Sequence, residues 1–285
     1  MNYMQSIEEL FKSIVPIKSV EDQSKSLSSL LSDPDYSEKF LLGIRNKFSN
    51  TNDEKVSVIT CTNKPYFLKN VFKNFLSQHW PNKELIIILN RDDMDINVWK
   101  KEADPYQNIF IFQLPEKISL GYCYNFAIEK ASYDYIATFD DDDYYAPNYI
   151  KDLMCAFQYT DADIVGKRAH YGYLEARRLL VLRHAADEYT YIDEDLFLDG
   201  GKKIMKKKVF DQVHYRNLSN LEDIYICKDS MKKGYKIFSA DKYNLVYIRR
   251  SNKGEHTWKG EDDIILRWLC TVIARTNDFK AWVTI

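Results

Sequence analysis

The sequence predicts an α/β protein in which a mostly parallel, mixed sheet of Rossmann-like type is flanked by helices. Between residues 55 and 150, short apolar runs alternate with amphipathic stretches of helical period. Such alternation is typical of right-handed β-α-β units, whose parallel strands are buried on both faces. The length of 285 residues suits one sizeable domain, or one domain with a small appendage.

Residues 1–54 differ from this pattern and predict an N-terminal helical extension. Apolar residues at helical spacing indicate three short amphipathic helices, with Ser19 and Ser37 as caps and Pro34 as a break. The extension either braces the main domain or mediates oligomerisation. The apolar groups are Ile7, Leu10, Phe11 and Ile14; Leu27, Leu30 and Leu31; and Phe40, Leu41, Ile44 and Phe48.

The elements of residues 55–150 follow one another regularly. Pro147 is expected to be the first residue of the last helix, because proline suits that position. Ligands of parallel sheets bind at the carboxyl ends of the strands, so the residues after each strand are the first candidates for a site. The expected strands are 56–61, 84–89, 109–114 and 133–139, and the expected helices are 67–76, 96–103 and 120–131.

Beyond residue 150 the order becomes mixed. We expect a smaller, less regular lobe over residues 151–260 and a C-terminal helix over 261–285. The lobe is predicted to contain strands at 163–166, 180–182, 237–239 and 245–248, and a helix over 221–232 that ends before Gly234.

Composition excludes several classes of protein. Lys and Arg total 40 and Asp and Glu total 42, so a net charge of −2 argues against a dedicated nucleic-acid binder. The five cysteines are odd in number, widely spaced and form no C-x-x-C pair, so they indicate neither a disulfide framework nor a thiolate zinc site and favour a reducing compartment. Neither a signal peptide nor an apolar run of membrane-spanning length is recognisable, so we expect a cytoplasmic protein.

The most informative feature is a run of four aspartates, residues 140–143, at the end of an apolar strand. Neighbouring carboxylates repel by about 4 kcal/mol at ~4 Å and an effective dielectric constant near 20. A hard divalent cation such as Mg²⁺ or Mn²⁺ would relieve this repulsion, and Asp140 and Asp142 have the D-x-D spacing of its ligands. The alternative interpretation is a solvated acidic turn.

Four further groups of residues are candidates for chemistry. Glu222 and Asp223 stand at a helix start, where the helix dipole stabilises carboxylates, yet one of them can also act as a general base. A lone His256 is more often a surface or core residue than a metal ligand. Arg249, Arg250 and Lys253 can bind phosphate. The lysines after Gly200 and Gly201, at positions 202, 203, 206, 207 and 208, are more often a solvated face than a site, and contact with an acidic acceptor is the alternative.

Taken in order, these residues resemble the inverting, nucleotide-sugar-dependent glycosyltransferases of family 2, which have the GT-A fold. The resemblance covers residues 56–258, about 70% of the chain. The matching segments are 57–65 as first strand and nucleotide loop, Gln78 with 84–87 as second unit, Gly121 and Asn125, 139–143 as D-x-D-D motif, Gly200 and Gly201, Glu222 and Asp223, and 256–258.

The resemblance implies roles for individual residues. Asp142 and His256 would bind Mn²⁺ or Mg²⁺, Asp140 the metal or the ribose, and Asp223, next to Glu222, would be the catalytic base. The nucleotide-binding residues would be Thr60, Thr62, Asn90, Asp92, Asn125, Asp140 and Asp141, and the acceptor-side residues would be Gly200, Gly201 and Trp258. The chain departs from the family at Asn90 to Asp93, which leaves uridine specificity open, and at Tyr124, where many relatives have Arg.

The implied reaction is metal-dependent, inverting transfer of a sugar from a nucleoside-diphosphate sugar, with UDP-sugars first, to an acceptor hydroxyl. The acceptor would be a bacterial polysaccharide such as a cell-wall polymer, a glycolipid or a peptide, and the partners would not include nucleic acid. Residues 55–150 would bind the nucleotide sugar and residues 151–260 the acceptor. Peripheral membrane association and oligomerisation stay open.

Two other functions compete with this one. A nucleotidyltransferase can share the sheet and the D-x-D site, but it would have a Gly-rich phosphate loop where residues 60–63 read Thr-Cys-Thr-Asn. An inactive binding module would have no need of two separate carboxylate clusters at strand and helix ends.

Overall fold

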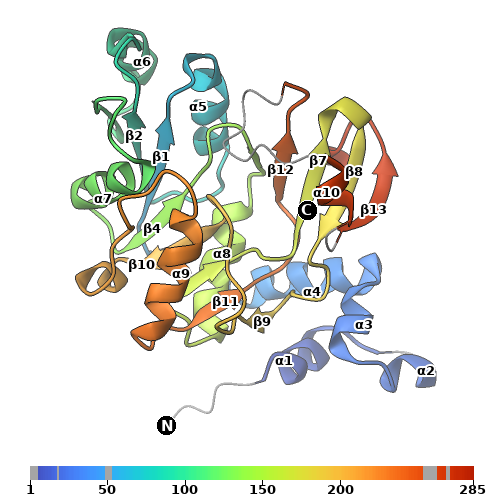
Figure 1. Ribbon diagram of the computed structural model, residues 1–285. Helices are drawn as coiled ribbons and strands as arrows, with labels where there is room; N and C mark the ends of the chain where they lie inside the picture. The colour runs from blue at the N-terminus through green and yellow to red at the C-terminus, as the bar shows by residue number, and fades with distance from the viewer. Residues whose placement is uncertain (1–5, 18, 49–52, 253–261, 268–269) are drawn as a thin grey trace.

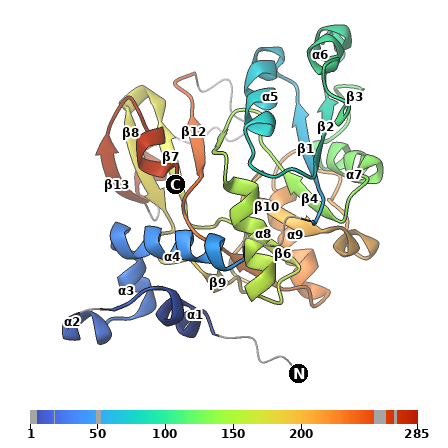
Figure 2. The ribbon, with the colours of Figure 1, turned by 180° about the vertical axis from the view of Figure 1, so that it is seen from behind.

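The computed structural model describes residues 6–17, 19–48, 53–252, 262–267 and 270–285 (Figure 1). Its central element is an eight-stranded sheet with the order β3-β2-β1-β4-β10-β6-β11-β9. A second sheet has the order β13-β8-β7-β12-β5 and lies beside the first, as Figures 1 and 2 show from opposite sides. The structure confirms the predicted α/β class with a helical N-terminal extension.

The first half of the chain builds the parallel part of the large sheet. β1 pairs in parallel with both β2 and β4, and β2 pairs in parallel with β3. Side chains of β1 alternate between two cores: Val58 packs with α5 and α8, and Ile59 packs with α7. The elements are β1 (Val56–Thr62), η1 (Pro65–Phe67), α5 (Leu68–Leu76), β2 (Lys83–Leu89), α6 (Ile96–Ala103), β3 (Ile109–Gln113), α7 (Leu120–Lys130) and β4 (Tyr135–Thr138).

The second half completes the large sheet with mixed pairing. β10 runs antiparallel to β4 and β6, and β11 runs parallel to β6. Pro147 was expected to be the first residue of α8, but the helix begins two residues later. The Pro147 carbonyl accepts a hydrogen bond from the backbone N–H of His79. The elements are α8 (Tyr149–Tyr159), β6 (Ile164–Gly166), β9 (Thr190–Tyr191), β10 (Lys203–Lys206), η3 (Lys207–Asp211), α9 (Glu222–Lys232) and β11 (Ile237–Ser239).

The prediction of a solvated lysine face was wrong for its first two members. Lys202 and Lys203 are buried, because Ile204 and Met205 place β10 between two other strands of the large sheet. The Lys203 ammonium donates to the carbonyl of Gly200 at 2.6 Å and to that of Leu198 at 3.2 Å. Backbone acceptors therefore take the place of water.

The smaller sheet contains the segment for which a C-terminal helix was predicted. That prediction was wrong, because β-branched residues at 271–273 form an edge strand that pairs antiparallel with β8. Only short helices flank this strand among the described residues. The elements are β5 (Tyr144–Tyr145), β7 (His170–Leu174), η2 (Glu175–Arg177), β8 (Leu179–Arg183), β12 (Leu245–Arg249), α10 (Asp262–Arg267), β13 (Cys270–Arg275) and α11 (Lys280–Val283).

In the N-terminal extension, residues 6–17 and 19–48 form four helices where three were predicted: α1 (Ile7–Ile14), α2 (Val20–Gln23), α3 (Leu27–Leu31) and α4 (Pro34–Lys47). Ser19 caps α2 as expected. Pro34 starts α4 instead of breaking a helix, because Asp33 is the cap and proline suits the first turn. Ser37 is therefore no cap; it is buried inside α4 and accepts a hydrogen bond from Lys242.

The extension packs directly on the main domain. Arg45 of α4 forms a buried ion pair with Asp152 of α8, at 2.6 Å. All five cysteines are free. Among the described helices, none combines the length and the apolar character that a membrane span requires.

Candidate active site

The four aspartates lie directly after β4, at the carboxyl end of the parallel strands. Two amides of α5, one turn apart, fix the path of this segment: Asn70 donates to the carbonyls of Asp141 and Asp143 at 2.7 and 3.0 Å, and Asn74 donates to that of Asp143 at 2.9 Å. The aspartate segment is therefore held by backbone contacts, and its carboxylates remain available for other partners.

Two of the carboxylates meet residues that follow β1. The Thr62 hydroxyl donates to Asp141 at 2.5 Å. The Lys64 ammonium lies 3.0 Å from Asp142 and 3.5 Å from Asp141. Burial, and then the charge of Asp142, raise the pKa of Asp141 to about 7. Negative charge at this strand end is thus only partly compensated by Lys64.

The glycine pair joins the aspartate segment to the predicted base. The Gly201 N–H donates to the Asp140 carboxylate at 2.9 Å, and the adjacent Gly200 N–H donates to the Asp223 carboxylate at 2.7 Å. Two residues separated by 83 positions in the sequence are therefore held by neighbouring peptide groups. The structure brings together four of the residues that the sequence singled out.

Side chains larger than hydrogen do not fit at these glycines. A Cβ at Gly200 would lie 2.6 Å from an Asp140 oxygen, and one at Gly201 would lie 2.5 Å from the Asp140 nitrogen. Gly200 also has a φ of +50°, which favours glycine. The buried Tyr145 hydroxyl closes the same corner, since it accepts from the Asp140 N–H and donates to the Gly201 carbonyl, both at 2.8 Å.

Glu222 and Asp223 form the first turn of α9, where the helix dipole favours carboxylates. Asp223 accepts backbone N–H groups on both oxygens, from Gly200 and from Ile224. Glu222 is buried, and desolvation followed by the charge of Asp223 raises its pKa to about 7. Leu221, before the helix, has a φ of +67°, so the chain enters this turn in a conformation that is unfavourable for leucine.

Lys202, which was predicted to be solvent-exposed, is buried beside the aspartate segment. The Lys202 ammonium is 4.0 Å from Asp143 and 3.8 Å from Asp199. Asp143 has one carboxylate oxygen bonded to the Ile248 N–H and the other without a hydrogen-bond partner among the described residues. The sequence carried no signal for this role, because Lys202 stands in a lysine-rich stretch of ordinary appearance.

Arg250, for which phosphate binding was considered, contacts the aspartate segment. It donates to the Asp142 carbonyl at 2.9 Å and lies 3.4 Å from a Glu175 carboxylate oxygen. Its position follows from β12, which ends one residue earlier and pairs in parallel with β7. Lys64, Lys202 and Arg250 thus surround the acidic segment with positive charge.

The side chains of three other predicted nucleotide-binding residues, Asn90, Asp92 and Asn125, already form hydrogen bonds within the protein. Asn90 follows β2 and donates to the Pro115 carbonyl at 2.8 Å, and Asp92 accepts the Glu116 N–H. Asn125 uses both ends of its amide on the Tyr215 backbone. Thr60 is buried in β1. His256 and Trp258 fall outside the described residues.

The residues present fit a divalent cation. Carboxylate oxygens are the donors that Mg²⁺ and Mn²⁺ prefer, and the clustered aspartates leave negative charge that the neighbouring cations do not fully balance. Asp140 and Asp142 would hold the ion. Within the described ranges no group of three Asp, Glu, His or Cys side chains is arranged to hold a metal, and the predicted third ligand lies outside those ranges.

Comparison with known proteins places this site in a family. The model described as Glycosyl transferase family 2 matches residues 57–218, more than half of the chain. The matched part includes the four aspartates and the glycine pair and ends before Glu222. No curated protein matches the sequence.

Solved structures show the same fold. The structure of S. aureus TarS 1–349 in complex with UDP-GlcNAc matches with a TM-score of 0.55 and 16% identity, over 70% of this chain and 59% of that one. GalNAc-T7 with UDP, GalNAc and Mn²⁺ matches with a TM-score of 0.56 and 10% identity, over 70% of this chain and 44% of that one. The aligned part thus spans about three fifths of TarS 1–349. At these identities the likeness shows the fold, which is GT-A.

Proposed function

Because the chain belongs to glycosyl transferase family 2, we propose that it transfers a sugar from a nucleoside-diphosphate sugar to an acceptor hydroxyl with inversion of the anomeric centre. The observation that carries the proposal is the bridge from Asp140 through Gly201 and Gly200 to Asp223. It supports a donor site and a base that share one corner of the sheet. UDP-sugars are the first donors to test, since TarS and GalNAc-T7 are described with UDP ligands.

The proposed donor site is the aspartate segment with its surrounding cations. Asp140 and Asp142 would hold Mn²⁺ or Mg²⁺, which neutralises charge that develops on a diphosphate leaving group. We expect Lys64 and Arg250 to attract the diphosphate oxygens, because the Lys64 ammonium contacts the Asp142 carboxylate and the Arg250 guanidinium contacts the Asp142 carbonyl. Thr62 orients Asp141 beside them.

The proposed base is Asp223, with Glu222 as the neighbouring candidate. The Gly200 N–H holds one Asp223 oxygen in place, and a carboxylate so fixed can take the proton from an acceptor hydroxyl as that hydroxyl attacks the anomeric carbon. Attack from the face opposite the leaving group inverts the centre. Glu222 competes for this role because its pKa of about 7 lies near a neutral working pH. The acceptor would be a polysaccharide, glycolipid or peptide of a bacterium.

The test compares D223N and E222Q with the wild-type chain. Asparagine keeps an oxygen for the Gly200 N–H, so D223N should retain UDP binding in the presence of Mn²⁺, measured by calorimetry. Its rate of UDP release from a UDP-sugar should fall by roughly 10²–10⁴-fold. Full turnover by D223N together with loss of turnover by E222Q would assign the base to Glu222. Full turnover by both variants would show that neither Asp223 nor Glu222 is the catalytic base.

The product distinguishes transfer of a sugar from transfer of a nucleotide. A glycosyltransferase releases the nucleoside diphosphate, whereas a nucleotidyltransferase releases pyrophosphate. A phosphorus NMR spectrum of the reaction separates the two. Thermal shifts with a panel of nucleoside diphosphates, with Mn²⁺ and with chelator, would rank the donors, because a ligand at 100 times its dissociation constant stabilises by ~2.7 kcal/mol.

A further inference from the structure

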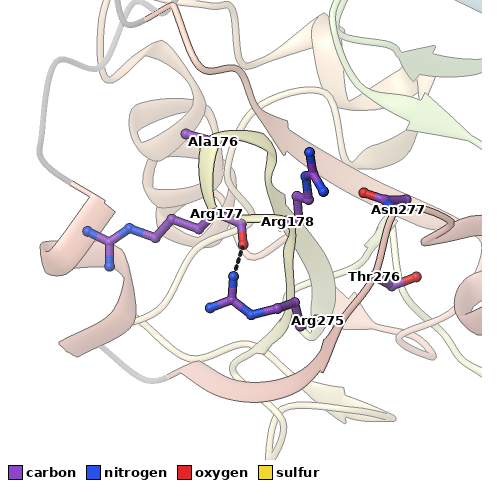
Figure 3. Close-up of a pocket in the computed structure, with 6 residues that line it drawn as sticks. All are labelled: Ala176, Arg177, Arg178, Arg275, Thr276 and Asn277. Atoms are coloured by element: carbon purple, nitrogen blue, oxygen red, sulfur yellow. Dashed lines mark hydrogen bonds between the residues drawn. The ribbon is translucent and has the colours of Figure 1, made fainter.

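We propose that a basic pocket on the smaller sheet binds an oxyanion, phosphate or carboxylate, carried by the acceptor; the inference rests on the proposed transferase function. The pocket has a volume of about 710 Å³, within the roughly 300–1,000 Å³ of small-molecule sites. Figure 3 shows the residues that line it, which come from the turn between β7 and β8 and from the end of β13. They are Ala176, Arg177, Arg178, Arg275, Thr276 and Asn277.

Two of the three arginines that line the pocket form no ion pair with the described residues. Arg177 pairs with Asp263 at 2.7 Å. Among the described residues, by contrast, no carboxylate pairs with Arg178 or with Arg275. The nearby Asp278 carboxylate accepts the N–H of Lys280 and thus starts α11. Arg178 and Arg275 both line the pocket and are both exposed, and the planar guanidinium is the side chain that binds phosphate and carboxylate oxygens in pairs.

The backbone around these arginines is fixed before any ligand arrives. Thr276 N–H donates to the Arg178 carbonyl at 2.9 Å, and Arg275 donates to the Arg177 carbonyl at 3.1 Å, the contact marked in Figure 3. Arg178 has a φ of +53°, a conformation that favours glycine. An arginine therefore stands at a position where the backbone conformation would favour glycine. A preformed pocket lowers the entropic cost of binding.

A short series of contacts connects the pocket to the aspartate segment. Glu175, next to the pocket residue Ala176, lies 3.4 Å from Arg250 and accepts the N–H of Ser251 at 3.0 Å. Arg250 in turn donates to the Asp142 carbonyl at 2.9 Å. The pocket therefore lies on the same end of β7 and β12 as the proposed donor site. An acceptor with regularly spaced anionic groups can place one of them in the pocket while its hydroxyl lies near Asp223.

The experiment uses the full chain with UDP and Mn²⁺ present, so that the proposed donor site is filled. Three probes are titrated by calorimetry: glucose 6-phosphate, whose single phosphate group binds Mn²⁺ only weakly, tri-galacturonic acid and the neutral maltotriose. The test variant is R178G/R275A, in which glycine removes the guanidinium and suits the positive φ. The control is K100A/K101A, which removes two exposed positive charges from the last turn of α6. R178K/R275K keeps the charge and loses the planar fork.

We expect the wild type to bind at least one anionic probe and not maltotriose. R178G/R275A should bind that probe at least tenfold more weakly, K100A/K101A should bind it as the wild type does, and R178K/R275K should fall between them. Whichever anionic probe binds more tightly identifies phosphate or carboxylate as the group recognised. Thermal melting of each variant checks that it is folded.

Equal binding of the anionic probes by the wild type and R178G/R275A would overturn the inference, as would no binding by the wild type. Arginine-dependent binding to anionic lipid vesicles without binding of the soluble probes would also overturn it, in favour of a membrane contact. Failure of the proposed transferase function is distinguishable from failure of this inference, because the wild type would then not bind UDP in the same calorimetric experiment.

Discussion

The Lys64 ammonium lies 3.0 Å from a carboxylate oxygen of Asp142, the residue proposed to hold a divalent metal. Burial alone would lower the pKa of Lys64, but Asp141 and Asp142 together raise it above its ordinary value. The lysine therefore stays charged and competes for the same oxygens as a metal ion. This relationship leads to the first prediction.

Replacing Lys64 with methionine should tighten Mn²⁺ binding to the nucleotide-free protein by about tenfold, equivalent to ~1.4 kcal/mol. The physical reason is that the competing ammonium is gone while the carboxylates remain. Titration of free Mn²⁺ by electron paramagnetic resonance measures this without any turnover. K69M, which removes an exposed lysine of α5, serves as the matched control. Unchanged or weaker Mn²⁺ binding in K64M would show that Lys64 and the metal do not share the site.

Gly201→Ala should lower both stability and transfer. The added Cβ would lie 2.5 Å from the Asp140 nitrogen and 2.8 Å from the Tyr145 hydroxyl, so the corner that holds Asp140 must shift. Overpacking of this kind costs about 1–3 kcal/mol of unfolding free energy. Urea unfolding and UDP release measure the two effects.

Gly234→Ala is the control for that experiment. Gly234 has a φ of +83° with open space around its Cα, so alanine there strains the backbone without touching the site. It should reduce stability by roughly 1 kcal/mol and leave transfer unchanged. Equal losses of activity in both variants would mean that the Gly201 effect is one of stability alone.

The buried Glu222 makes stability depend on pH. Its pKa is about 7 in the folded chain and 4.5 in an unperturbed glutamate, so the folded state holds a proton that the unfolded state releases at lower pH. Its contribution is fully present below pH ~4.5 and is lost as pH rises through ~7. Between pH 5 and 8 the wild type should therefore lose more unfolding free energy than E222Q, by up to about 3 kcal/mol.

Urea unfolding of metal-free protein at both pH values measures the difference, with E129Q, an exposed carboxyl of α7, as control. The other titrating groups are common to all three proteins, so they cancel in the comparison. Parallel pH dependence of the wild type and E222Q would place the Glu222 carboxyl in a more polar environment than the structure gives it.

Replacing Arg45 with methionine should destabilise the fold by about 3–5 kcal/mol, because among the described residues it leaves the buried Asp152 carboxylate with Asn244 as its one hydrogen-bonding side chain. R45M/D152N should recover part of the loss, since the uncompensated charge is removed. K47M, an exposed neighbour on α4, is expected to change stability little. A loss of less than 1 kcal/mol in R45M would mean that the extension packs loosely.

Local patterns were sufficient to predict the parallel half of the sheet and the acidic segment. A continuous apolar run as short as 84–89 is typical of a strand that is buried on both faces, whereas a buried helix would be longer. Residues 203–206 escaped prediction because two lysines enclose Ile204 and Met205, and lysines count as exposed until a partner is known. Residues 270–275 became a strand through pairing with β8, a long-range contact that no local window contains.

In the candidate site, too, local patterns predicted some features, and others depend on long-range contacts. Asp140, Asp142 and Asp223 were identified from their residue types and their places after a strand or at a helix start. Their connection through the Gly200 and Gly201 peptides depends on three segments that meet only in the folded chain. Lys202 could not be found at all from sequence, since its burial follows from the position of β10 in the middle of the sheet.

Lys242 of the main domain donates hydrogen bonds to two of the N-terminal helices. Its buried ammonium reaches the Leu31 carbonyl at 2.9 Å and the Ser37 hydroxyl at 3.0 Å, beside Glu188 of the main domain. Removing residues 1–54 would take away two of these three acceptors from an ammonium that is almost completely buried. The two helices α3 and α4 therefore complete the hydrogen bonding of a buried charge of the main domain, and we expect a fragment without them to be less stable than the full chain.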